Sequence, residues 1–164
     1  MTLLDPDTLS NRELLVLYGR VLEALRTRGV VRSKNNPVAD YAEGLCQRAL
    51  DLTLAPKNAT GYDGTDPTGH KIEIKARRIT KENGSRQLSA IRGIGQHHFD
   101  YLAGVLFNAD FSVFKGCLIP YELIKEHGRH NEYTNSHRFL LADSVWSLPG
   151  VRDITEALQD AERM

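Results

Sequence analysis

The stretch GYDGTDPTGHKIEIK, from Gly61 to Lys75, predicts a β-hairpin and sets the register of its two strands. Its centre, Asp66 to Gly69, reads as a type I turn, because proline pre-sets φ at the second position and glycine is free to take φ > 0 at the fourth. A three-residue loop of this kind usually ends in a glycine bulge. We therefore expect two strands that pair around a bulged turn.

In the bulged geometry the two acids of the hairpin, Asp63 and Glu73, face each other. Strand alternation puts Lys75 on the same face as Glu73, while Ile72 and Ile74 point to the opposite face and the core. Opposed like charges cost roughly 0.2 to 1 kcal/mol, which a divalent cation with oxygen ligands would offset. A two-residue loop would instead set Asp63 opposite Ile72. Plain solvent-facing residues with a weak surface ion pair are the other alternative.

Length and composition predict one globular domain. The chain has 164 residues, 41% hydrophobic and 26% charged, with a formal net charge of zero, so we expect a single domain spanning residues 1–164. Its sequence contains no apolar run of membrane-spanning length and begins without a signal-peptide pattern, which predicts a cytoplasmic protein with no membrane partner. Cys46 and Cys117 lie far apart in apolar patterns, which indicates buried core residues.

Helix and strand signals alternate along the chain. Ser10 to Glu13 form a capping box that opens an apolar run at helical spacing, and the run ends at Gly29. Asn36 and Pro37 are a cap and a first helical residue for a second helix. This order predicts an α/β domain with a mixed sheet. The further elements that we expect are strands at 52–55, 71–79, 99–107, 111–119 and 138–141, short helices at 85–92 and 120–125, a turn or helix at 144–148 and a final helix from about residue 153.

Asp63, Glu73 and Lys75 form the pattern D-x9-E-x-K, which follows the predicted helix that carries Glu43. This arrangement resembles the PD-(D/E)XK nuclease superfamily over a core of about residues 36–119. The segments RSKNNPVADYAEG, GYD, IKARR and SRQLSAIR also resemble an uncharacterised bacterial family assigned to that superfamily. The resemblance implies a restriction endonuclease-like core, a mixed β-sheet flanked by helices, with an N-terminal helix and a C-terminal helical extension.

The resemblance also implies metal-dependent hydrolysis of phosphodiester bonds. Asp63 and Glu73 would hold Mg²⁺ or Mn²⁺, with the backbone carbonyl of Ile74 as a third ligand. The ion would neutralise charge on the phosphate and lower the pKa of the attacking water. Lys75 would orient or polarise that water. Glu43 would reach the same site from the helix, either binding a second ion or fixing a metal-bound water.

Basic and polar residues around this motif predict contacts to nucleic acid. Arg77 shares a strand face with Lys75, which would let it contact the phosphate next to the cut, and neutralising phosphates is the usual role of such residues. A solvated loop is the alternative for this group. The predicted nucleic-acid contacts are Arg77, Arg78, Arg86, Gln87, Lys34 and Asn35.

The sequence therefore favours a magnesium-dependent endonuclease that acts on DNA, with a role like that of restriction or defence enzymes. We expect a homodimer, since a duplex has two strands and one domain supplies one site, and no organic cofactor. Tyr62 stands where the name-giving proline of the superfamily would be. The alternatives are a nucleic-acid-binding module that does not cleave and a subunit of a defence complex with the same fold.

Overall fold

The computed structural model describes residues 4–33, 35–56 and 58–164. Its strands in the central sheet are β1 (Thr53–Leu54), β2 (Gly64–Thr65), β3 (Lys71–Arg78), β5 (Tyr101–Phe107), β6 (Val113–Pro120) and β9 (Arg152–Asp153). They lie in the order β1-β2-β3-β5-β6-β9. β3 and β5 are parallel, whereas the other neighbours are antiparallel. The predicted α/β class with a mixed sheet is confirmed.

Two helices, α2 (Pro37–Leu50) and α4 (Thr155–Arg163), pack on one face of this sheet. α2 begins as predicted, because the Asn36 side chain accepts a hydrogen bond from the N–H two residues later at 3.1 Å. Leu45 on α2 is fully buried in a core that also contains Ile74 of β3. The flanking helices and the helical C-terminal extension are therefore present.

The opposite face is covered by a small second sheet and a short helix. These elements are β4 (Ile91–Arg92), α3 (Tyr121–His127), β7 (Arg129–Asn131) and β8 (Ser136–Arg138), and the small sheet has the order β4-β8-β7. The second core joins Leu106 of β5 to Phe139 and to residues of β4 and α3. Short 3-10 turns lie at η1 (Pro6–Thr8), η2 (Ile94–Gln96) and η3 (Asp143–Ser147).

The prediction of a short helix at 85–92 is wrong. Gln87 forms an isolated bridge with Leu140, and Ile91 pairs with His137 in the small sheet. Leu88 and Ile91 are both buried in the second core, so their three-residue spacing resembles a helix face although the chain is extended. The strand partner comes from almost 50 positions further along the chain, where local spacing gives no signal. The strand expected at 138–141 ends at residue 138 and begins earlier.

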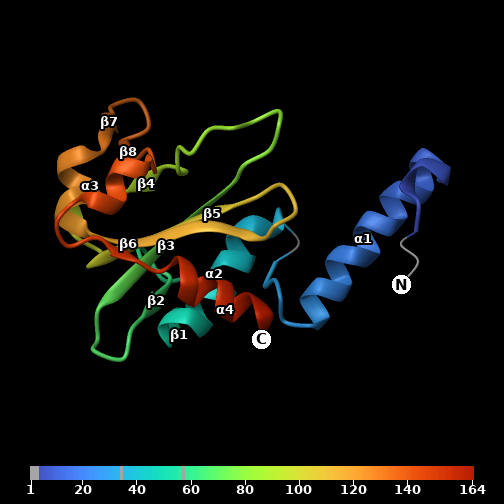
Figure 1. Ribbon diagram of the computed structural model, residues 1–164, viewed down its shortest axis with the longest axis horizontal. Coiled ribbons are helices and arrows are strands. Elements are labelled where there is room, and N and C mark those ends of the chain that lie inside the picture. Colours follow the sequence, from blue (N-terminus) through green and yellow to red (C-terminus); the bar gives the residue numbers. More distant parts are fainter. Residues whose placement is uncertain (1–3, 34, 57) are drawn as a thin grey trace.

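The N-terminal helix α1 (Asn11–Thr27) forms as predicted but stands apart from the sheet (Figure 1). Its capping box is complete, since the Ser10 side chain accepts from the N–H of Glu13 and the Glu13 carboxylate accepts from the N–H of Ser10. Its apolar side chains are mostly exposed, for example Leu15 at 72% and Tyr18 at 58%. No helix in the described part of the chain is both long and apolar enough to cross a membrane.

Both cysteines are core residues, as expected. Cys46 lies in the core beneath α2 and Cys117 in the core on the opposite face. Each thiol is free, and burial raises its pKa to about 12. Neither is suited to act as a nucleophile near neutral pH, since the thiolate is the reactive form.

Candidate active site

β2 and β3 pair in the register that the bulged loop predicts. Gly64 lies opposite Ile72, and the N–H of Asp66 donates to the carbonyl of His70 at 2.9 Å. Gly69 has φ +92°, a conformation that glycine adopts without a steric cost. The two-residue loop is therefore excluded. The register ends at Gly64 and Ile72, so Asp63 is not paired directly with Glu73 as expected but lies beside the strand segment that carries it.

Asp63 ends the pairing between these two strands. Its N–H donates to the carbonyl of Ile72 at 2.8 Å, and its own Oδ2 accepts from the N–H of Ile74 at 2.7 Å. The carboxylate thus takes the place of the next backbone acceptor at this edge of β3. Burial raises the pKa of Asp63, the charge of Glu73 adds to the shift, and the Ile74 hydrogen bond opposes it.

Glu73 and Lys75 lie on one face of β3, as strand alternation predicts. Lys75 Nζ is 2.6 Å from Glu73 Oε1, and the two side chains are only 22% and 12% exposed. An ion pair on an open surface contributes little, whereas these groups are largely withdrawn from water. The two carboxylates, Asp63 and Glu73, share one electrostatic environment, in which Lys75 partly compensates Asp63 as well.

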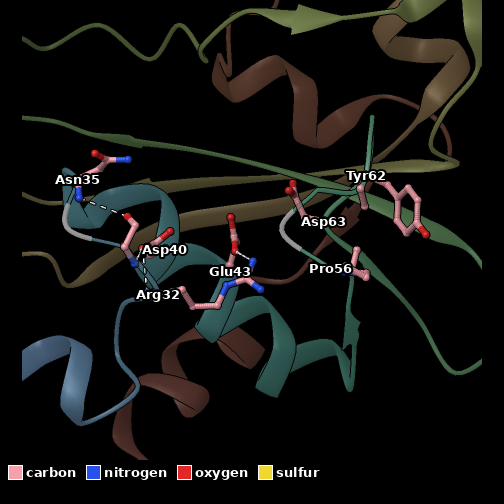
Figure 2. A pocket seen from close by; sticks show the side chains of 10 residues that line it. Arg32, Asn35, Asp40, Glu43, Pro56, Tyr62 and Asp63 are labelled. Atoms are coloured by element: carbon pink, nitrogen blue, oxygen red, sulfur yellow. Dashed lines mark hydrogen bonds and ion pairs between the residues drawn. The ribbon is translucent and has the colours of Figure 1, made fainter.

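Glu43 and Asp63 line one pocket of about 230 Å³ (Figure 2). Glu43 projects from α2, and its Oε2 accepts a hydrogen bond from Nη2 of Arg32. Burial raises the pKa of Glu43, while the Arg32 hydrogen bond opposes the shift and the nearby charge of Asp63 adds to it. The helix glutamate therefore reaches the pocket that Asp63 lines, whereas Glu73 and Lys75 do not line this pocket.

The site lies along the side of β3 that continues beyond its pairing with β2, which ends at Ile72. Ile72 and Ile74 pack into the core beneath α2, so alternation along β3 directs Glu73 to the other face. Asp63 stands between them and interacts with both Glu43 and Glu73. No three His, Cys, Asp or Glu side chains within residues 4–33, 35–56 and 58–164 are already gathered as a metal site. Glu43 and Glu73 are each turned to a cationic side chain.

Two of the arginines predicted to contact nucleic acid hold other parts of the protein. Arg78 Nε donates to the carbonyl of Ala109 at 2.8 Å, and its guanidinium lies 4.1 Å from the ring centre of Phe111. Arg86 Nη1 is 2.8 Å from Asp143 Oδ1. These contacts tie the chain after β3 to the β5–β6 loop and to η3.

The other predicted contacts are spread over two regions. Arg77 is half-buried on β3, one strand alternation beyond Lys75, and Gln87 is exposed beside the small sheet. Asn35 lines the pocket that contains Glu43. Lys34 lies outside the described residues. Of this group, Arg77 and Asn35 are positioned with the acidic residues.

Sequence reasoning gave Arg32 no role in the acidic site. The sequence places it in a polar stretch before α2, where tracking a phosphate backbone or supporting a helix cap are both open. No spacing rule links it to Glu43, because the two are joined by the fold of the segment between α1 and α2 rather than by a strand or helix period.

Comparison with models of known protein families gives no match for this chain, and no curated protein matches its sequence significantly. The mixed α/β sheet does not define an activity either, because one fold can host many functions. The function has to be argued from the arrangement of Asp63, Glu73, Lys75 and Glu43.

Proposed function

We propose that the protein is a metal-dependent endonuclease that hydrolyses phosphodiester bonds in DNA. The observation that carries this proposal is the withdrawal of Asp63, Glu73 and Lys75 from water along the side of β3 that continues beyond its pairing with β2. Simple surface residues of a hairpin would be solvated. Keeping two acids together in a half-buried position costs stability, and such costs are typical of functional sites.

The residues present fit a hard divalent cation such as Mg²⁺ or Mn²⁺. Asp63 and Glu73 supply carboxylate oxygens, the ligand type that these ions prefer. The N–H of Ile74 points to the Asp63 edge, and a strand residue directs its carbonyl to the same side as its N–H. The Ile74 carbonyl is thus available as a third oxygen ligand in the proposed site.

The chain's own side chains have distinct roles in the proposed reaction. When bound, the ion supplies Lewis acidity and neutralises charge on the phosphate. Lys75 is close enough to Glu73 to orient a water molecule and to stabilise negative charge beside it. Glu43 is placed to bind a second ion or to hold a water molecule. Arg77 continues the Lys75 face toward the adjoining phosphate.

The proposed partners are DNA and a second copy of the chain, and hydrolysis requires no organic cofactor. A homodimer would bring one site to each strand of a duplex. The assembly can be measured by light scattering coupled to size-exclusion chromatography. A mass of 18.4 kDa for the protein alone, together with one chain per duplex in the complex, would contradict the dimer.

A second candidate function is a nucleic-acid-binding module, or a subunit of a defence complex, that does not cleave. The observation that favours it is that Glu73 and Glu43 are each paired with a cation of the same chain. In that case both ion pairs are permanent, and metal would change neither stability nor DNA chemistry.

Incubation with supercoiled, linear and single-stranded DNA separates the two functions. We expect nicking or cutting in Mg²⁺ or Mn²⁺ and none in EDTA. Lys75→Ala should slow cleavage by about 10²- to 10³-fold, the range for loss of one group that stabilises charge in the transition state. Lys125→Ala, at an exposed position on α3, is the matched control. Wild-type protein that leaves every substrate intact in both metals, or Lys75→Ala that cuts at the wild-type rate, contradicts the nuclease.

A further inference from the structure

Arg32 is held over the acidic pocket by its backbone as well as by its side chain. Asp40 Oδ2, on the first turn of α2, accepts from the N–H of Arg32 at 2.8 Å and from the N–H of Ser33 at 2.6 Å. The side chain then extends to the Glu43 carboxylate (Figure 2). The position of Arg32 at the pocket therefore does not depend on its bond to Glu43 alone.

The Arg32–Glu43 pair is accessible from the pocket. The Arg32 side chain is 32% exposed and the Glu43 side chain 16%, and both line the pocket together with Asp63. A guanidinium carries five N–H donors and keeps its charge at any pH of interest, and its planar fork binds carboxylate and phosphate groups in the same way. A phosphate can accordingly replace Glu43 as the partner of Arg32.

Besides its bond to Arg32, Glu43 interacts electrostatically with Asp63. The charge of Asp63 acts on Glu43 across the pocket and disfavours its ionised form. A cation at Asp63 reverses that repulsion into attraction, because it places positive charge between two carboxylates. Glu43 bonded to Arg32 and Glu43 turned to such a cation are alternative arrangements of one side chain.

We propose that Arg32 is a substrate-binding residue whose partner changes when metal binds. In the metal-free protein it is held by Glu43, and in the loaded protein Glu43 turns to the ion while Arg32 binds a DNA phosphate. The inference rests on the proposed nuclease function and adds a regulation to it: the site acquires strong affinity for DNA only after it holds metal. One anion, the carboxylate, is exchanged for another, the phosphate.

DNA affinity of the full-length protein, measured by fluorescence anisotropy with a short duplex, tests this exchange. The titrations are run in EDTA and in Ca²⁺, with the duplex checked afterwards for intact length. Arg32→Gln should bind like wild type in EDTA and about tenfold more weakly in Ca²⁺, the factor expected for one charge-assisted contact. Arg28→Gln, at the exposed end of α1, is the control for loss of a positive charge nearby.

Glu43→Gln tests the other half of the exchange without metal. It removes the negative charge that Arg32 bonds to at this position, so DNA binding in EDTA should strengthen, by up to about tenfold. The gain should disappear in the double variant Arg32→Gln/Glu43→Gln, which shows that it passes through Arg32. Glu122→Gln, on the exposed side of α3, measures the effect of removing an acid elsewhere.

A purely structural ion pair gives a different pattern. Arg32→Gln would then weaken DNA binding equally in EDTA and Ca²⁺, or in neither, and either result overturns the exchange. Arg32→Lys, which keeps the charge but not the fork, supplies a second test if Arg32→Gln fails to fold: a ratio of affinities in Ca²⁺ and EDTA that is smaller than in wild type supports the exchange, and a ratio equal to that of wild type overturns it. Wild type that binds no duplex in either condition overturns both proposals, whereas wild type that cuts DNA while Arg32→Gln behaves identically overturns the exchange alone.

Discussion

The two ends of the β2–β3 hairpin shift the pKa of an aspartate in opposite directions. At the turn, Asp66 Oδ1 accepts from the N–H of Thr68 and from the N–H of His70, each at 2.9 Å. Burial acts against ionisation there, but hydrogen bonds from the Thr68 hydroxyl, from His70 and from the Thr68 N–H together outweigh it and hold the pKa of Asp66 below its usual value. At the base, burial raises the pKa of Asp63, and the charge of Glu73 raises it further.

The difference shows that the two ionised acids contribute to the stability of the fold with opposite signs. The folded structure stabilises the ionised form of Asp66 and destabilises the ionised form of Asp63. Both residues have the same chemistry and lie three positions apart, so neither composition nor propensity distinguishes them. Variants at the two ends should therefore separate activity from stability.

The largest expected effect is on cleavage at the base of the hairpin. Asp63→Asn should lower the rate of DNA cleavage by on the order of 10²-fold or more, since it removes a charge that the proposed metal site needs. Asp66→Asn should leave the rate unchanged, because the turn lies at the far end of the hairpin. Single-turnover cleavage of a labelled duplex compares them. Equal losses in the two variants would contradict the assignment of the base as the site.

At the turn of the hairpin, loss of the aspartate should lower the stability of the protein. Asp66→Ala removes the acceptor of several hydrogen bonds, and the free energy of unfolding should fall by about 1 to 2 kcal/mol. Urea titration followed by circular dichroism measures this. Thr60→Ala, at an exposed position before β2, is a suitable control. If Asp66→Ala were as stable as wild type, the turn hydrogen bonds would contribute nothing in water.

At the base of the hairpin, removal of an aspartate charge should raise the free energy of unfolding of the metal-free protein, the opposite of the effect at the turn. Asp63→Asn keeps an acceptor for Ile74 and removes one of two neighbouring charges, so the free energy of unfolding in EDTA should rise by a few tenths to about 1 kcal/mol. Mg²⁺ or Mn²⁺ should raise the Tm of wild type and leave the Tm of Asp63→Asn unchanged, because an ion stabilises the folded state only when it binds to it.

Thermal melts of both proteins, with and without metal and with a short duplex present, check this prediction. A surface ion pair predicts the opposite pattern: a slight loss of stability in Asp63→Asn and no metal shift in either protein. The duplex is included so that an ion that binds weakly to the protein alone, and more tightly beside DNA, is also detected.

The smallest expected effect lies further along β3. Arg77→Ala should reduce the slope of log affinity against log salt concentration by about one, the amount for one lost phosphate contact. Arg78→Ala is the instructive neighbour, because its guanidinium already bonds to Ala109. The double variant should lose no more slope than Arg77→Ala. A slope that is unchanged in Arg77→Ala would return this residue to a structural role.

Local signals in the sequence account well for the hairpin and poorly for its surroundings. Pro67 and Gly69 restrict the backbone within four residues, so the turn, the register and the shared face of Glu73 and Lys75 follow directly. The spacing of Leu88 and Ile91 predicts a helix at 85–92, but the chain there is extended because a distant strand supplies its hydrogen bonds.

The same division applies to the two long helices. The caps at Ser10 and Asn36 determine where α1 and α2 begin, because capping satisfies backbone groups within one turn. Both sequences are amphipathic, yet α2 buries Leu45 while α1 leaves Leu15 exposed. Which apolar face is covered depends on neighbours far away in sequence.

By itself, the sequence determined the α/β class, the register at the turn of the hairpin and the shared face of Glu73 and Lys75, because helix caps, turn residues and strand alternation act over a few residues. The position of Asp63 beside Ile72 and Ile74 follows from hydrogen bonds that the turn does not specify. Only the tertiary structure decided that Glu43 faces Asp63 across a pocket and that Arg32 bonds to Glu43. These residues belong to a helix and a connecting segment that approach the hairpin through packing and desolvation. Their charges interact strongly because the fold withdraws them from water, and no spacing along the chain encodes that distance.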